Sequence, residues 1–132
     1  MVATALISVS FISLYAAIAY GFSAVEVSRE NLRATQVILE KMETLRLYSW
    51  DQINTPGFVP STFDAPFNPS TNATGGFLFQ GTVIFTNAPL AESYSSDLRL
   101  VLVTVNWTSG NVPRSRQMAT LVSRYGLQNY IY

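Results

Sequence analysis

The chain has 132 residues, with 8 Lys and Arg balanced by 8 Asp and Glu, so its formal net charge is zero. A chain without excess positive charge is not typical of nucleic-acid-binding proteins, and we expect no nucleic-acid partner. It contains no histidine and no cysteine, which excludes Ser-His-Asp and Cys-His catalytic arrangements, most zinc sites and any disulfide. We therefore expect no catalytic residue, no metal and no cofactor, and a protein that is not an enzyme.

The first 25 residues carry no charged side chain, and Glu26 is the first charged residue. An uncharged apolar run of this length predicts a membrane-spanning helix. At ~1.5 Å per residue it reaches roughly 38 Å, enough to cross a hydrocarbon core of about 30 Å. The side chains expected to face lipid, or the core of an assembly, are Leu6, Ile7, Val9, Phe11, Ile12, Leu14, Ile18 and Phe22.

Three interpretations of this run remain open. A cleaved secretory signal begins with positive charge and has an apolar core of about 7–15 residues, whereas no Lys or Arg precedes Arg29 here. A plain single-span anchor usually carries Lys or Arg on its cytoplasmic flank, and none precedes the run in this sequence. An anchor that leaves the membrane to form a filament core is favoured, because small and polar residues throughout the run let helices approach closely.

The helical pattern continues without a break through residues 26–50. Apolar residues recur there at spacings near three, four and seven and define one stripe, which we expect to pack on a sheet: Leu32, Ile38, Leu39, Met42 and Leu45. Charged residues fill the other faces, and Glu30–Arg33 and Glu43–Arg46 are spaced as i,i+3 ion pairs. These charges fit a solvated helix face.

The run MVATALISVSFISLYAA, followed by an amphipathic helix that ends near LEKMETLRLYSWDQI, resembles the N-terminal helix of type IV pilins and type II secretion pseudopilins. In that family a basic leader is cleaved after a glycine, before a phenylalanine-led segment with a glutamate, and the new N-terminus is methylated. Those features are absent from the given chain, and the resemblance places Met1 a few positions beyond the glutamate. Val103, Val105 and Trp107 resemble a strand of minor pilins.

The resemblance implies a structural function. The chain would sit in the inner membrane and contact the lipid bilayer before assembly. An inner-membrane assembly platform would then bundle the helices into an extracellular or periplasmic filament, made of copies of this chain or of major and minor pilins together. The family's glutamate would neutralise the N-terminal amine of the adjacent subunit. The alternative is a single-pass, membrane-anchored periplasmic or surface binding domain that does not polymerise.

Pilin helices often lose helical hydrogen bonding over a few residues inside the filament, and two places in this chain are candidates. Ser8, Ser10 and Ser13 compete for backbone hydrogen bonds and stand among residues of lower helix propensity. Gly21 is the second candidate. We expect a break at one of these places in a filament and a continuous helix in a detergent-solubilised monomer.

Residues 51–76 are rich in proline and glycine and are expected to form a long connecting loop. Its three phenylalanines, Phe58, Phe63 and Phe67, indicate that the loop folds onto the domain surface. A packed connection is favoured over a variable loop that contacts other subunits.

Residues 77–132 show the alternation expected of an antiparallel sheet. We expect strands from residue 77, over residues 98–107 and over residues 114–124, with a turn at 108–111 and a tail at 127–132 that adds an edge strand or packs over the sheet. Val101, Val103, Val105 and Trp107 should share one face. The expected fold is therefore α+β: a long helix packed against a small antiparallel sheet.

Basic residues of the last predicted strand have three interpretations. Arg114, Arg116 and Arg124 either protect a solvated edge strand by their charge, form salt bridges to the helices of neighbouring subunits, or bind a polyanion, and the first is favoured. The helix residues that we expect to take part in such inter-subunit salt bridges are Glu26, Arg29, Glu30 and Arg33.

Overall fold

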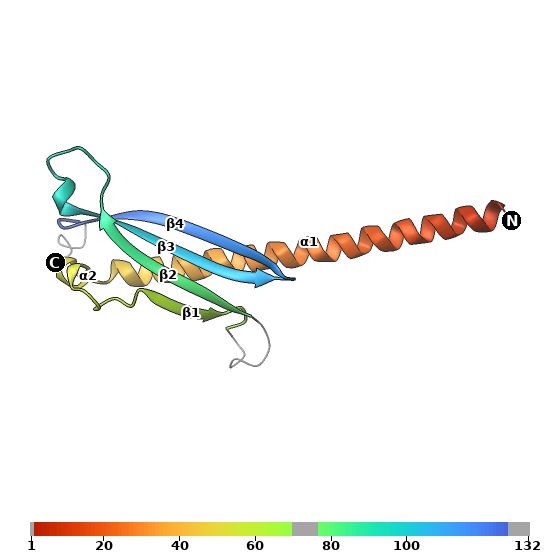
Figure 1. The fold of residues 1–132 in the computed structure, drawn as a ribbon, viewed down its shortest axis with the longest axis horizontal. Coiled ribbons are helices and arrows are strands. Elements are labelled where there is room, and N and C mark those ends of the chain that lie inside the picture. Colours follow the sequence, from red (N-terminus) through yellow and green to blue (C-terminus); the bar gives the residue numbers. More distant parts are fainter. Residues whose placement is uncertain (1, 70–76, 127–132) are drawn as a thin grey trace. The chain divides into compact units, whose positions relative to one another are not determined.

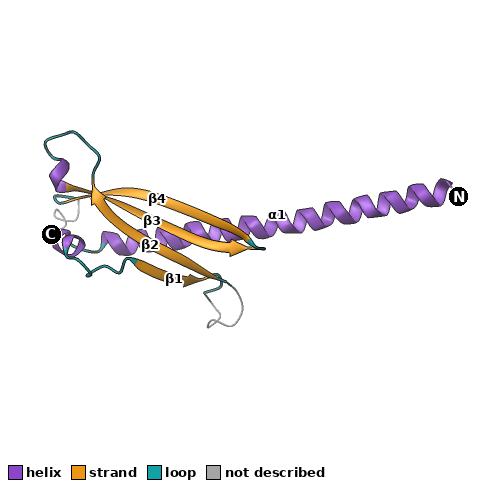
Figure 2. Cartoon of the chain, viewed as in Figure 1, coloured by secondary structure: helices purple, strands orange, loops and turns teal. Residues whose placement is uncertain are grey.

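The computed structural model describes residues 2–69 and 77–126. The elements follow the chain as α1 (Val2–Arg46), α2 (Trp50–Asn54), β1 (Thr62–Pro66), β2 (Leu78–Asn87), η1 (Ser95–Asp97), β3 (Leu98–Ser109) and β4 (Val112–Ser123) (Figures 1 and 2). The chain divides into unit 1, Met1–Leu32, and unit 2, Arg33–Tyr132. The fold is α+β, as the sequence predicts.

The long helix ends at Arg46, a few residues before the predicted end at residue 50. The amides of Leu47 and Tyr48 donate to carbonyls three residues back, at 3.1 and 3.2 Å, so the last turn tightens. Ser49 then starts α2, because its side chain accepts from the Gln52 amide while its own amide donates to Gln52 Oε1. This S-x-x-Q capping box is visible in the sequence. The prediction of a loop from residue 51 was therefore wrong over α2.

The predicted 51–76 loop also contains a strand. β1 (Thr62–Pro66) pairs antiparallel with β2, with Phe63 opposite Gly81. Phe63 and Phe67 pack against the core, whereas Phe58 is exposed and meets Tyr48 edge-on, with ring centroids 5.8 Å apart. A five-residue strand that ends in proline suits the edge of a sheet, where a missing N–H donor breaks no ladder.

Four antiparallel strands form one sheet in the order β1-β2-β3-β4, as Figure 2 shows. The three predicted strands are present as β2, β3 and β4. The turn between β3 and β4 consists of Gly110 and Asn111, at φ 54° and 64°. Two left-handed residues are what a two-residue type I′ hairpin requires, which places the turn within the predicted segment 108–111.

One face of the sheet forms the core of unit 2. Val101, Val103, Val105 and Trp107 are buried on this inner face, as the alternation predicts. They cluster with residues from α1, from the segment between α2 and β1, and from β2: Ala34, Val37, Ile38, Met42, Leu45, Val59, Phe79 and Val83. The last part of the predicted loop, residues 70–76, and the predicted tail, residues 127–132, lie outside the described residues.

The helix stripe needs correction at two positions. Ile38, Met42 and Leu45 are buried, but Leu32 is 66% exposed and Leu39 47% exposed. At about 100° per residue, Leu39 points roughly 125° away from the middle of the buried arc. Ala34 and Val37 belong to the buried arc instead, because they lie on the side of the helix that packs against the sheet.

Candidate functional site

The first candidate site is the apolar surface of unit 1. Every residue from Val2 to Glu26 is exposed, and the first 25 residues carry no charge. Among the described residues, α1 is the one helix that is long and apolar enough to cross a membrane. The exposed apolar side chains include all those predicted to face lipid or a filament core: Leu6, Ile7, Val9, Phe11, Ile12, Leu14, Ile18 and Phe22.

Serine hydroxyls on this surface are satisfied inside the helix. Ser8 Oγ donates to the Thr4 carbonyl at 2.8 Å, Ser10 Oγ to Leu6 at 2.9 Å and Ser13 Oγ to Val9 at 2.8 Å. A hydroxyl that donates to the carbonyl four residues back is already satisfied, so placing it in an apolar environment costs little free energy. The helix can therefore carry these serines within a bilayer or a helix bundle.

Residues 8–13 and Gly21 lie inside a continuous helix in this single chain. Each serine hydrogen-bonds to a carbonyl that also accepts the helical N–H bond, which is the competition inferred from the sequence. A break of the helix inside a filament stays a prediction.

Five of the seven charged residues predicted to link subunits are exposed or paired within the chain. Glu26, Arg29 and Arg116 are exposed. Arg33 pairs within its own chain with Glu40, at 3.1 Å. Arg124 pairs with Asp97, at 3.6 Å. Partly exposed pairs of this kind contribute roughly 0–1 kcal/mol each.

Glu30 requires a correction. Its side chain is 2% exposed, so this carboxylate is not presented on the surface to a neighbouring subunit. Glu30 lies one helical turn before Ala34, on the side of α1 that carries the buried residues. The spacing of the charges alone does not reveal this position. The other predicted i,i+3 pair, Glu43–Arg46, is present at 3.1 Å.

Arg114 and Arg116 lie on the inner face of the edge strand β4, directly opposite Trp107 and Val105. The Arg114 Nε is buried without a hydrogen-bond partner among the described residues. Inward-pointing charges on an edge strand oppose the addition of a further strand. The placement fits the edge-protection interpretation of these two residues.

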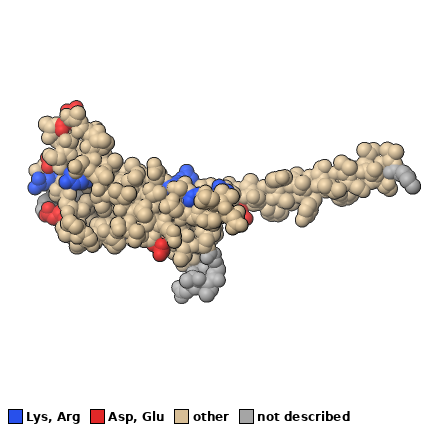
Figure 3. Space-filling view, viewed as in Figure 1, with Lys and Arg blue, Asp and Glu red and all other residues tan. Residues whose placement is uncertain are grey.

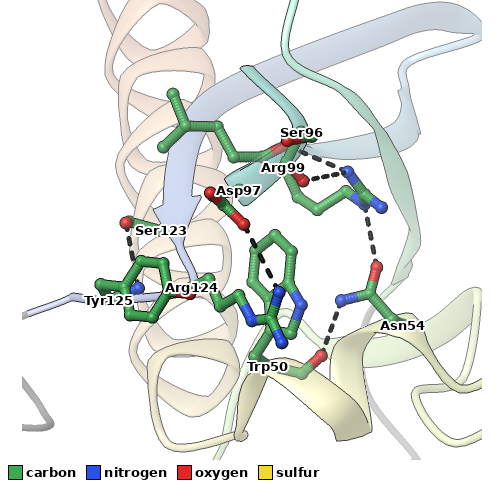
Figure 4. Close-up of polar contacts among 9 residues, drawn as sticks. Trp50, Asn54, Ser96, Asp97, Arg99, Ser123, Arg124 and Tyr125 are labelled. Atoms are coloured by element: carbon green, nitrogen blue, oxygen red, sulfur yellow. Dashed lines mark hydrogen bonds and ion pairs between the residues drawn. The ribbon is translucent and has the colours of Figure 1, made fainter. Parts of the chain in front are cut away.

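A polar cluster that the sequence reasoning missed joins α2 to the start of β3 (Figure 4). Arg99 Nε donates to Asn54 Oδ1 at 2.9 Å, and Asn54 Nδ2 donates to the Trp50 carbonyl at 2.7 Å. The Arg99 guanidinium also lies 5.2 Å from the centroid of the Trp50 ring. Because Arg99 faces inward at the end of β3, this Arg99 cluster fixes the short helix against the sheet.

Beside the Arg99 cluster lies a surface depression of about 430 Å³ between residues 47–51 and 122–126. Its charged lining residues are Asp51 and Arg124, and Arg124 is paired with Asp97. Within residues 2–69 and 77–126 there is no group of three acidic, histidine or cysteine residues that would hold a metal ion. The depression thus presents no assembled set of reactive groups.

The outward face of the sheet has a feature that the sequence reasoning did not use. The outward residues of β2, β3 and β4 include no Lys, Arg, Asp or Glu, and Asp64 on β1 is the charged residue of this face. The alternating outward positions of residues 78–86, 98–108 and 113–123 already show in the sequence that this face carries no charge.

Comparisons of the chain with protein-family models, with curated proteins and with solved structures give no match.

Proposed function

We propose that this chain is a structural subunit of a type IV pilus-like or pseudopilus filament. Before assembly, the apolar half of α1 holds it in the inner membrane, and after assembly the same half forms part of the filament core outside that membrane. The observation that carries the proposal is a single helix with two different halves. Residues 2–25 are exposed and uncharged, whereas residues 34–45 bury one stripe in the core of the domain.

Continuity of the helix supports a mechanical role. α1 is one continuous helix of 45 residues, so the apolar half and the half that carries the buried stripe belong to the same element. The satisfied serines and the small residues Ala16, Ala17, Ala19 and Gly21 allow the same surface to face either lipid or other helices. A plain membrane anchor has no need of closely packing small residues.

Membrane insertion is tested by one charged substitution and a matched control. Ile12→Lys places a charge in the middle of the apolar run, at a cost of about 2.5–3.5 kcal/mol for insertion. Gln36→Lys adds the same charge at an exposed position of the same helix in unit 2. After carbonate extraction of membranes, the parent chain and Gln36→Lys should remain in the pellet, and Ile12→Lys should be depleted from it. Equal extraction of all three would contradict anchoring by this helix.

Polymerisation is tested separately. The protein, expressed in its native cells, should yield filaments in sheared material viewed by electron microscopy. Ala17→Phe keeps the segment apolar, so insertion should be preserved while close helix packing, and with it the number of filaments, should fall. If the protein stays in the membrane and no filaments form, the single-pass anchored domain that does not polymerise is the correct function.

A further inference from the structure

The outer face of the sheet carries an unusual distribution of side chains for a surface in water. We call the outward residues of β2, β3 and β4 the outer face. Antiparallel sheets with one solvated face normally carry polar and charged residues there, but this face carries no charge. In the view of Figure 3, the domain surface is mostly without charged atoms, which gather toward its ends and edges.

The strand register divides the outer face into two halves. In the apolar half, Ile84, Leu102 and Ala119 lie directly across from one another, and Leu100 lies across from Leu121 in the next row. Ile84 and Leu121 are exposed, the latter by 50%. In the polar half the rows are uncharged: Thr82, Thr104 and Gln117, then Gln80, Asn106 and Ser115.

We propose that the outer face is a self-association surface that binds the same face of a second copy of this chain, related by a two-fold axis through the apolar half. A face without charge can meet its own copy without placing like charges opposite each other. The leucine rows of the two copies would exclude water from each other, and the rim of hydroxyl and amide side chains would supply uncharged hydrogen-bonding partners.

Other occupants fit this face less well. Protein surfaces that bind a membrane are enriched in Lys, Arg, Trp and Tyr, and those that bind nucleic acid carry clustered Lys and Arg. None of these residue types points outward from β2, β3 or β4. A peptide that adds a strand binds at a sheet edge and not on a face. A face without charged side chains therefore favours a second copy.

The size of the face sets the expected strength of binding. Three strands about 4.8 Å apart and five rows spaced roughly 6.7 Å apart give a planar footprint of about 450–500 Å² per copy. Two copies would bury about 1,000 Å², near the lower limit for a specific interface. The pair should be weak for chains diluted in solution and should form when the apolar helix confines many chains to one membrane, which raises their effective concentration.

The absence of cysteine makes the test direct. Leu102→Cys places a single thiol at the centre of the outer face, and Leu90→Cys places one on the loop between β2 and η1, where Leu90 is 41% exposed. The full chain in lipid vesicles is treated with a short bis-maleimide. Both variants share the apolar helix, so helix-driven association affects them equally. Covalent dimers should form at least 5-fold more from Leu102→Cys than from Leu90→Cys.

A second substitution tests the charge argument in the Leu102→Cys background. Leu121→Glu places an uncompensated charge within the apolar half of the interface and should lower dimer yield at least 10-fold, whereas Leu90→Glu should leave it unchanged. Gln117→Glu repeats the test at an exposed polar position, in case Leu121→Glu destabilises the fold. Thermal unfolding followed by tryptophan fluorescence checks each variant.

Three results would overturn the proposal. The first is equal dimer yield from the two cysteine variants. The second is a Leu102→Cys thiol that a monofunctional maleimide cannot label in the dilute detergent-solubilised chain, which would mean that the chain covers its own outer face. The third is crosslinking of Leu102→Cys in cell membranes to a different protein in place of a second copy. None of these results depends on whether filaments form.

Discussion

Gly81 is the position where a single added methyl group should have the clearest effect on stability. A Cβ atom built on Gly81 would lie 2.5 Å from Cε2 of the Phe63 ring and closer still to Cε1 and Cζ, whereas ordinary contact begins at 3.4 Å. Phe63 is paired with Gly81 across β1 and β2, and Lys41 Nζ lies 4.9 Å from the ring centroid. Gly81→Ala therefore requires the ring to move by about 1 Å or more.

The magnitude follows from what that movement disrupts. Overpacking of this kind costs typically 1–3 kcal/mol, and loss of an exposed cation–π contact adds about 0.5–1 kcal/mol. Replacing glycine in a strand recovers about 0.5–1 kcal/mol of backbone entropy. The expected net loss is about 2 kcal/mol of unfolding free energy, which corresponds to a fall in Tm of roughly 8–16 °C for a domain of this size.

The assay is thermal unfolding of the full chain in detergent, followed by tryptophan fluorescence, since both tryptophans lie in unit 2 and Trp107 is buried. Phe63→Ala provides the control, because it removes the ring that the methyl group meets. In the Phe63→Ala background, Gly81→Ala should stabilise the domain slightly, so the effect changes sign. If Gly81→Ala lowers Tm equally in both backgrounds, the steric argument is refuted.

Three further predictions concern other parts of the chain. A Cβ at Gly21 meets nothing within 4 Å, so Gly21→Ala should stabilise the monomeric helix by about 0.5–1 kcal/mol, seen as slower amide hydrogen exchange around residue 21; faster exchange would contradict this. Arg99→Lys cannot reproduce the guanidinium contacts to Asn54 and Trp50 and should lower unfolding free energy by about 1 kcal/mol, and a Tm equal to that of the parent would show that the Arg99 cluster contributes nothing. Asn111→Val places a β-branched residue at φ 64° and should destabilise the hairpin by about 1–2 kcal/mol in the same unfolding assay, whereas Asn111→Gly should be tolerated.

The sequence predicts most of this architecture because its signals are local. A run of 25 uncharged residues predicts an exposed apolar helix without any knowledge of its partners. Alternation in residues 98–107 places Val101, Val103, Val105 and Trp107 on one face, and these residues are buried together. The Gly110–Asn111 turn is likewise a local matter, because left-handed φ values favour glycine and asparagine.

Other features depend on contacts between distant segments. β1 is too short and too rich in turn residues to be identified alone, and it is a strand because β2 offers it a free edge, with Phe63 covering Gly81. The rotation of the helix about its axis was misjudged because spacing alone does not say which flank of Ile38 meets the sheet. That contact buries Val37 and leaves Leu39 exposed.

The same distinction separates the two candidate surfaces. The apolar helix is determined by composition alone, since any continuous, uncharged and predominantly apolar run of that length behaves in the same way toward lipid. The uncharged outer face exists only after three strands pair in one register, which brings Ile84, Leu102 and Ala119 into one row from positions far apart in the chain. Local pattern fixes which residues can share a face of one strand, whereas pairing between strands decides which of those faces become one surface.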